Sequence, residues 1–498
     1  MPSPAARIGP SRMPPPPLSA RVGGRGAFAP AAGALVAATG MAALLAAAAC
    51  ARYAPAPLAP QALADEYAAR RLDAPDLRRF LAEHGSTAPD SGWRAADLAL
   101  AALYYQPALD AARASWRSSR AAEVTAGARP RPEAQGELGY ATTAAVFESR
   151  WLAAISAILT IELGGKRGAR LAAARARTAV AEADLEETAW RTARGARDAV
   201  LELRGAEERL ADETLALARV SAFAERLRRR YAEGTLSRSE LAAVESEEAD
   251  ARAAVSRDRA AVEAARVALA RAVGVTPAAL ARQGLVERDS IPSCEPAAPA
   301  ESLVALALRR RPEVGRALAE YAVAEGDLRI AVAGSYPDLA LGPGFTWDQG
   351  IARWSIFPAL RGIPLDGNRG PIAEATARRA EAAARFEERQ QQVVSEVQGA
   401  LAGCRLALAD VAGADSVRQA TARQAALARA AYDRGEIAAV QLEPIELAET
   451  RALRELHAAR RRLAGAAAAL EAAIGAWPAG PVRWPDPRIP TRRREAGA

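Results

Sequence analysis

The chain is poor in the residues that carry most catalytic and metal chemistry. It has one lysine among 498 residues, only two histidines and only three cysteines. The histidines and cysteines show neither a metal-ligand spacing nor a nucleophile–base pair. They are His84, His457, Cys50, Cys294 and Cys404. We therefore expect no enzyme activity, no catalytic or metal site and no cofactor.

Aromatic residues make up only 5% of the chain although half of it is hydrophobic, because alanine dominates. This shortage of large apolar side chains argues against one compact core. Abundant alanine beside arginine and glutamate is typical of long helices packed side by side. The net charge of +7 comes from arginines that alternate with glutamates and form no basic block. We therefore expect solvated helix faces and no nucleic-acid partner.

Residues 1–49 have the features of an export signal. Pro, Gly and Arg are frequent in residues 1–26, and the run from Ala27 to Cys50 has no charge. This order predicts a signal peptide, because the alternative of a permanent membrane span fits poorly with weakly apolar Ala and Gly. The ending LLAAAAC resembles a bacterial lipobox, which implies a lipidated Cys50 at the mature N-terminus. An ordinary signal with an incidental cysteine is the alternative.

The second half of the chain repeats the first. IELGGKRG (161–168) corresponds to IPLDGNRG (363–370), YAEGTL (231–236) to YDRGEI (432–437), and LARAVGV (269–275) to LEAAIGA (470–476). These segments keep one order and an offset of 201 or 202 residues, which indicates a tandem duplication.

Each copy predicts a helix, a β-hairpin, a long helix and a return helix. The domain division is then a signal at 1–49, an N-terminal anchored and equatorial segment at 50–97, and a first repeat at 98–274. An equatorial linker at 275–302, a second repeat at 303–477 and a tail at 478–498 follow. Within the repeats, the hairpins are expected at 137–163 and 337–365, the long helices at 166–232 and 367–433, and the return helices at 237–273 and 438–475.

The hairpins contain most of the aromatic side chains. Alternating apolar residues such as Leu339, Leu341 and Phe345 predict half-buried strands. Aromatic residues that flank short strands are typical of a transmembrane β-barrel. A small soluble β-layer that caps a helical bundle is the alternative. The expected membrane-interface aromatics are Tyr140, Trp151, Phe345, Trp347, Trp354 and Phe357, with Phe147 in the same group. Because two hairpins cannot close a barrel, several chains must pool their strands.

The long helices predict a coiled coil. Leucines recur every seven residues at 203, 210 and 217, and Leu241, Val255, Val262 and Leu269 follow the same spacing after the turn, with Glu248 as the gap. Gly234 and Gly435 then end long helices at the tips of two antiparallel hairpins.

This ordered duplication resembles the TolC-type outer-membrane efflux proteins over residues 60–477. The resemblance implies a mostly α fold in which duplicated antiparallel coiled-coil helices form a trimeric α-barrel. Four strands per chain would contribute to a shared transmembrane β-barrel. It also implies a passive outer-membrane efflux duct that extends into the periplasm. The implied partners are two further copies, a periplasmic adaptor, an inner-membrane pump and outer-membrane lipid.

The resemblance also assigns residues. Residues that match the family's tip turns, where an adaptor binds, are Tyr231, Gly234, Leu236, Leu241, Tyr432, Gly435, Ile437 and Leu442. The alternative is that these residues only cap and pack the helical hairpins. Glu443 and Glu446 lie near the family's channel constriction, where a carboxylate ring favours cations. A solvated helix face is the alternative for these two residues. The alternative functions are a periplasmic coiled-coil adaptor, which has one hairpin between β-domains, and a structural scaffold.

Overall fold

The structure is a computed structural model that describes residues 53–86, 92–142, 150–282, 294, 298–348 and 351–477. The chain separates into two units, residues 1–63 and 64–498. In the first unit, residues 53–59 have no regular structure, and helix α2 (Pro60–Ala68) begins at Pro60. The expected signal peptide, Cys50, Phe147 and the tail lie outside the described residues.

Both halves share the succession of two helices, two strands, a long helix and a return helix, and the first half has α3 and α8 in addition. The first comprises α3 (Pro75–Glu83), α4 (Ala95–Tyr105), α5 (Pro107–Ala126), β1 (Glu133–Tyr140), β2 (Trp151–Ile161), α6 (Lys166–Ala232), α7 (Arg238–Val273) and α8 (Pro277–Ala281). The second comprises α9 (Ala300–Arg310), α10 (Pro312–Ala333), β3 (Asp338–Asp348), β4 (Ile351–Arg361), α11 (Arg369–Asp433) and α12 (Ala439–Ala473). The expected mostly helical class with short β-hairpins is confirmed.

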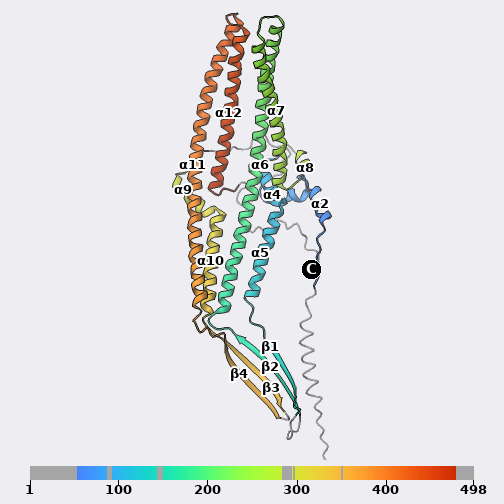
Figure 1. The fold of residues 1–498 in the computed structure, drawn as a ribbon, viewed down its shortest axis with the longest axis vertical. Helices are drawn as coiled ribbons and strands as arrows, with labels where there is room; N and C mark the ends of the chain where they lie inside the picture. Colours follow the sequence, from blue (N-terminus) through green and yellow to red (C-terminus); the bar gives the residue numbers. More distant parts are fainter. Residues whose placement is uncertain are drawn as a thin grey trace, which may run out of the picture. The chain divides into compact units, whose positions relative to one another are not determined.

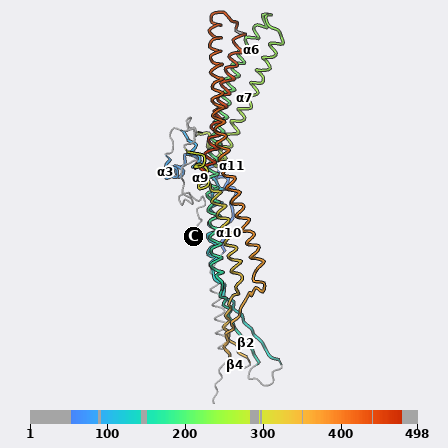
Figure 2. Tube along the Cα trace, turned by 90° about the vertical axis from the view of Figure 1, so that its left-hand side faces the viewer, coloured from blue at the N-terminus to red at the C-terminus, as the bar shows by residue number. Residues whose placement is uncertain are grey.

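The helices α6 and α11 run through the unit from the sheet to the tips (Figure 1). They contain 67 and 65 residues, so each is roughly 100 Å long. On the tip side, α7 packs on α6, α6 on α12, and α12 on α11. On the sheet side, α5 packs on α6, α6 on α10, and α10 on α11. The outermost helices on the tip side are therefore α7 and α11. The helical hairpin of α6 and α7 and that of α11 and α12 diverge towards their tips (Figure 2).

The largest apolar core lies where α3, α4 and α8 meet the middle of α6 and the end of α7. Nine of the eleven residues of α4 are buried. Tyr105, at the end of α4, donates a hydrogen bond from its hydroxyl to the Arg71 carbonyl at 2.6 Å, and burial raises its pKa to about 12. A smaller core joins α9 to α11 and α12.

The four strands form one antiparallel sheet in the order β1-β2-β3-β4, so β2 and β3 join the two repeats. The strands β1 and β4 are its edges. In β3 the buried positions are Ala340, Gly342 and Gly344, whereas Leu341 and Phe345 on the other face are only partly buried. The expected alternation is present, but small residues occupy the buried face. In β4, Trp354 and Ile356 are 84% and 73% exposed.

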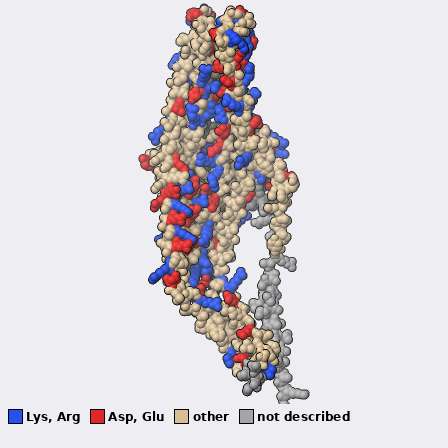
Figure 3. Space-filling model, viewed as in Figure 1, with Lys and Arg blue, Asp and Glu red and all other residues tan. Residues whose placement is uncertain are grey.

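Charged residues of both signs are interspersed over the helices on the face shown in Figure 3. Among the described residues, no helix combines the length and the apolarity needed to cross a lipid bilayer.

Candidate functional site

The two helical tips are built from the same turn. Gly234 and Gly435 have φ of 77° and 78°, a left-handed conformation that favours glycine. In each turn the next amide donates back into the helix: Thr235 N to Arg230 O, and Glu436 N to Ala431 O, both at 2.9 Å. These bonds satisfy carbonyls that the helix leaves free. The tips therefore end where the sequence predicts.

The return helices begin with different caps. Ser237 accepts a hydrogen bond from Glu240 N, and the Glu240 side chain accepts one from Ser237 N at 3.0 Å. This reciprocal capping box stabilises the start of α7. Its counterpart in α12 is Ala438, which has no side-chain acceptor, so that only Gln441 accepts a bond from the Ala438 amide. The first tip is thus capped by two side chains and the second by one.

The expected adaptor-contact residues fall into two groups. Tyr231 and Tyr432 are 43% and 44% exposed. Leu241 and Leu442 are 3% and 9% exposed, and Leu241 packs in an apolar cluster with Phe223 and Leu447. The tyrosines are therefore accessible to a partner, whereas the leucines hold the hairpin together.

One ion-pair motif occurs in both hairpins. In the first, Arg228 lies 3.6 Å from Glu245 through Nε and 2.5 Å from Glu248 through Nη2. In the second, Arg429 binds Glu446 through Nε at 2.6 Å and Glu449 through Nη2. All three residues keep the 201-residue offset of the duplication. Glu446 therefore belongs to a repeated staple between the long and the return helix.

Glu248 is the gap in the heptad pattern of α7, and its ion pairs explain why a carboxylate occupies this position. The side chain of Glu248 is only 3% exposed and is paired with Arg228 and Arg252. The hydrogen bond from Arg228 is the main cause that lowers the pKa of Glu248, which keeps the carboxylate ionised.

Glu443 has a different role from Glu446. It is 7% exposed and pairs with Arg226 of α6, in the other hairpin. Ala242 of the first hairpin stands at the position equivalent to Glu443, and Leu427 of the second stands at the position equivalent to Arg226. This pair is therefore not repeated. Of the two expected constriction residues, only Glu443 links the hairpins.

Further polar contacts continue along the seam between the hairpins. Arg454 binds Glu213 at 2.7 Å, and Asp212 accepts from the His457 ring at 2.7 Å and from Arg461 at 3.2 Å. As the residue number in α12 increases, the residue number of its partner in α6 decreases, as antiparallel packing requires. An open groove of about 1060 Å³ lies between these two helices. The sequence pattern did not predict this seam, because it joins charges about 245 residues apart.

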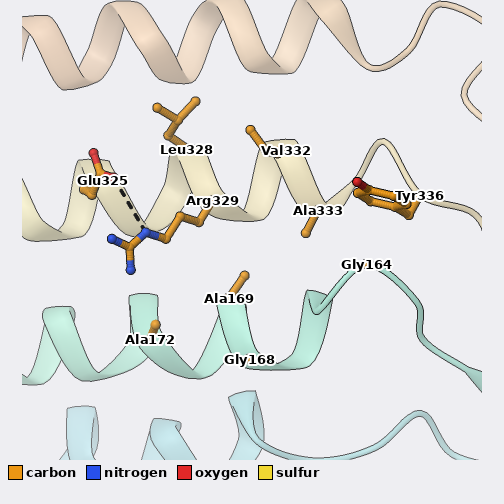
Figure 4. Close-up of a pocket in the computed structure, with 10 residues that line it drawn as sticks. All are labelled: Gly164, Gly168, Ala169, Ala172, Glu325, Leu328, Arg329, Val332, Ala333 and Tyr336. Atoms are coloured by element: carbon orange, nitrogen blue, oxygen red, sulfur yellow. Dashed lines mark ion pairs between the residues drawn. The ribbon is translucent and has the colours of Figure 1, made fainter.

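A second cavity of about 430 Å³ lies where α10 and the start of α6 meet the sheet. Tyr336 lies over Gly164, where a Cβ atom would come within 2.4 Å of its ring (Figure 4). The lining is mainly apolar, and its ion pair is Glu325 with Arg329. Among the described residues, no group of three His, Cys, Asp or Glu side chains is arranged to bind a metal ion. The residues that line this cavity belong to the junction between the helices and the sheet.

Cys294 and Cys404 form a disulfide bond. It joins the segment between the repeats to α11 within the smaller core. Sequence reasoning missed this pair, because 110 residues separate its members and no local pattern connects them.

The outward faces of α7 and α11 carry exposed, uncharged stripes that repeat every three or four residues. On α7 the stripe comprises Ala242, Ser246, Ala249, Ala253, Ser256, Ala260, Ala264 and Val267. On α11 it comprises Ala402, Leu406, Ala409, Gly413, Ser416, Ala420, Gln424 and Leu427. Each stripe lies opposite its helix's buried seam. Small residues at this spacing are suited to close helix packing.

Residues 303–476 match the family model described as outer membrane efflux protein. The second repeat is therefore similar to the domain of outer membrane efflux proteins. The match covers the helices and strands from α9 to α12. A search of curated proteins gave no match.

Solved channel structures have the same fold as most of the chain. The outer-membrane channel OprN is 21% identical, with a TM-score of 0.65, over 82% of this chain and 92% of its own. VceC of Vibrio cholerae is 20% identical, with a TM-score of 0.63, over 80% and 98%. The CmeC channel of Campylobacter jejuni is 15% identical, with a TM-score of 0.62, over 86% and 90%. The TolC-type fold is therefore confirmed, and the similar proteins are channels, not enzymes.

Proposed function

We propose that this chain is one subunit of a passive trimeric outer-membrane channel that exports small molecules or ions. The observation that carries the proposal is the open four-stranded sheet. Among the described residues, its edge strands pair with no further strand, and its apolar side chains are exposed. An open edge cannot face lipid, because its amides and carbonyls would lack partners. Pairing β4 of one copy with β1 of the next removes every edge, and three copies supply twelve strands.

The stripes on α7 and α11 support the same ring. These are the outermost helices on the tip side, and both present small uncharged residues away from their own hairpins. Packing α7 of one copy against α11 of the next would cover both stripes and enclose a tunnel. The strands and the helices would then close around one axis.

The tips are the proposed contact for a periplasmic adaptor, through which an inner-membrane pump supplies energy. The accessible tip residues are Tyr231, Leu236, Tyr432 and Ile437, presented by the turns at Gly234 and Gly435. Leu241 and Leu442 would act indirectly, by holding the hairpins in shape.

We assign the gate to the pair of Glu443 and Arg226. Opening the tunnel requires the two helical hairpins to separate, and this pair of an exposed arginine with a buried glutamate spans them near the tips. Glu446 would instead remain paired with Arg429 in either state. Acylation of Cys50 would anchor the mature chain to the outer membrane.

A periplasmic adaptor or a coiled-coil scaffold is the alternative function. An adaptor has one hairpin between β-domains, whereas this chain has two hairpins and a repeat similar to the efflux-protein domain. A scaffold gives no role to the exposed apolar strands.

Conductance across a planar lipid bilayer tests the function. We expect small single-channel steps from the native protein and larger steps from Arg226→Glu, in which like charges separate the hairpins. Arg309→Glu, an exposed change on α9 outside both stripes, is the matched control and should conduct like the native protein. A stable trimer that conducts neither as the native protein nor as Arg226→Glu would contradict the channel.

A further inference from the structure

The two ends of the sheet differ in their apolar side chains, whereas exposed arginines occur at both ends, with Arg150 and Arg353 at the end remote from the helices. At the end remote from the helices, aromatic rings pair across strands: Tyr140 with Trp151 at 5.0 Å and Phe345 with Trp354 at 4.9 Å between centroids. At the end next to the helices, the pattern is arginine beside aliphatic side chains. Basic side chains are visible on the lower ends of the helices beside the sheet (Figure 3).

The arginines lie in the connections between helices and strands. Arg129 and Arg131 precede β1, Arg361 ends β4, and Arg369 begins α11. All four are exposed, and none has an ion-pair partner among the described residues. We call these four residues the arginine collar.

Nearby carboxylates are mostly committed to other cations. Asp338 binds Lys166 at 2.7 Å, and Glu162 binds Arg170 at 2.9 Å. Glu133 and Asp366 remain as exposed acids in the same connections. The four collar arginines therefore exceed the uncommitted carboxylates by two, and the surface is positive.

Exposed aliphatic side chains accompany the collar. Leu365 is 99% exposed and Ile363 56%, both between Arg361 and Arg369. Leu163, in the connection from β2 to α6, is 38% exposed. A guanidinium beside an uncovered leucine suits a boundary at which phosphate lies above hydrocarbon.

The proposed ring concentrates these charges. Arg361 lies on the edge strand β4, and Arg129 and Arg131 lead into the other edge strand β1. When β4 of one copy pairs with β1 of the next, the connections of both strands meet at one seam. Each seam then receives all four collar residues, two from each copy.

We propose that the arginine collar binds the headgroups of anionic phospholipids in the bilayer leaflet next to the helices, with Ile363 and Leu365 entering its hydrocarbon. This inference rests on the proposed function, because the collar is complete only in the closed ring. Guanidinium groups bind phosphate oxygens through charge-assisted hydrogen bonds. Each lost arginine should weaken this binding about fivefold.

Thermal unfolding of the trimer in uncharged detergent tests the lipid site. Short-chain phosphatidylglycerol should raise the melting temperature by about 5 °C, because a ligand that binds only the folded state stabilises it. Phosphatidylcholine of the same chain length should not. The collar variant replaces Arg129, Arg131, Arg361 and Arg369 with Gln. The control variant replaces Arg78, Arg79, Arg309 and Arg310, which are exposed on α3 and α9 and lie outside the two stripes, with Gln.

We expect the collar variant to remain a trimer with an unchanged melting temperature in detergent alone and to lose the phosphatidylglycerol shift, while the control variant keeps it. The proposal is overturned if the native trimer shows no shift, if the collar variant keeps it, or if both variants lose it equally. An equal shift with inorganic phosphate alone would show a free-anion site and overturn the lipid assignment. Failure of the proposed function would be distinguishable, because the native protein would then not form a detergent-dependent trimer.

Discussion

The two repeats share one fold but stabilise its middle differently. In the first, α4 is almost wholly buried against α6 and α7, and α3 covers it. In the second, the corresponding helix α9 buries only Leu303 and Ala307. The disulfide between Cys294 and Cys404 lies in this thinner core. A covalent bond thus reinforces the copy whose apolar layer is smaller.

The residue before α5 and its counterpart before α10 show the same divergence. Gln106 donates from its side-chain amide to the Arg271 and Ala272 carbonyls at 2.6 and 2.7 Å, and so caps the end of α7. In the second repeat this position is Arg311, which pairs instead with Glu313 at 3.0 Å and with Glu396 of α11. A neutral cap in one copy corresponds to an ion pair in the other.

Removing apolar volume should affect the first repeat most. Leu98→Ala in α4 leaves a cavity around a side chain that is 0% exposed, with an expected cost of about 2–5 kcal/mol. Leu303→Ala in α9, the matched change, should cost less, because Leu303 is 8% exposed at a smaller core. Thermal unfolding of both variants measures the difference. Equal losses would contradict the unequal cores.

Breaking the disulfide should affect the second repeat. The Cys294→Ser/Cys404→Ser variant should lose about 2–4 kcal/mol of stability. A reductant should lower the melting temperature of the native protein and leave that of the variant unchanged. Maleimide labelling of the denatured chain gives an independent check: with Cys50 acylated, no thiol should react before reduction and two should react after it. Two reactive thiols before reduction would show that the bond is absent.

The repeated ion pair should be stronger in the first hairpin. Glu248→Gln should cost about 1–3 kcal/mol, because it leaves buried polar groups poorly paired. Glu449→Gln should cost less, because the Glu449 side chain is 23% exposed compared with 3% for Glu248. Denaturant titration of both variants ranks the costs, and a larger cost for Glu449→Gln would refute the order.

The ion pair of Glu248 with Arg228 predicts that the stability of the protein depends on pH. Since the pKa of Glu248 is lowered in the folded protein, the unfolded chain takes up this proton first as the pH falls. The stabilisation is therefore complete above the ordinary glutamate value of about 4.3 and is lost as the pH falls through the lowered value. The difference in stability between native protein and Glu248→Gln should shrink below pH 4. A constant difference would contradict the linkage.

The tip glycines should give the smallest and most equal effects. Gly234→Ala and Gly435→Ala each force a left-handed conformation on alanine, at a cost of about 1 kcal/mol. Because no atom lies within 4 Å of either added Cβ, the cost comes from the backbone alone. Gly399→Ala, in the middle of α11, is the control and should be neutral or stabilising. Unequal costs at the two tips would show that their turns differ.

Local patterns predicted the periodic parts of this fold. Runs without proline predicted α6 and α11, and glycine at 234 and 435 predicted the tips. The parity of Leu341 and Phe345 predicted strands but not which face would be buried, because apolar alternation does not distinguish a core from a lipid-facing surface. The disulfide and the pair of Glu443 with Arg226 depend on which helices become neighbours, which no local pattern specifies. The repeated pair of Arg228 with Glu248 was accessible in principle, since the duplication preserves it as Arg429 with Glu449.

The central claim is that several copies of this chain pool their strands into one barrel. The most direct test is the mass of the purified mature protein by light scattering, in detergent and after detergent removal. The account predicts a particle of three chains that precipitates when detergent is withdrawn. A monomer that stays in solution without detergent would contradict it.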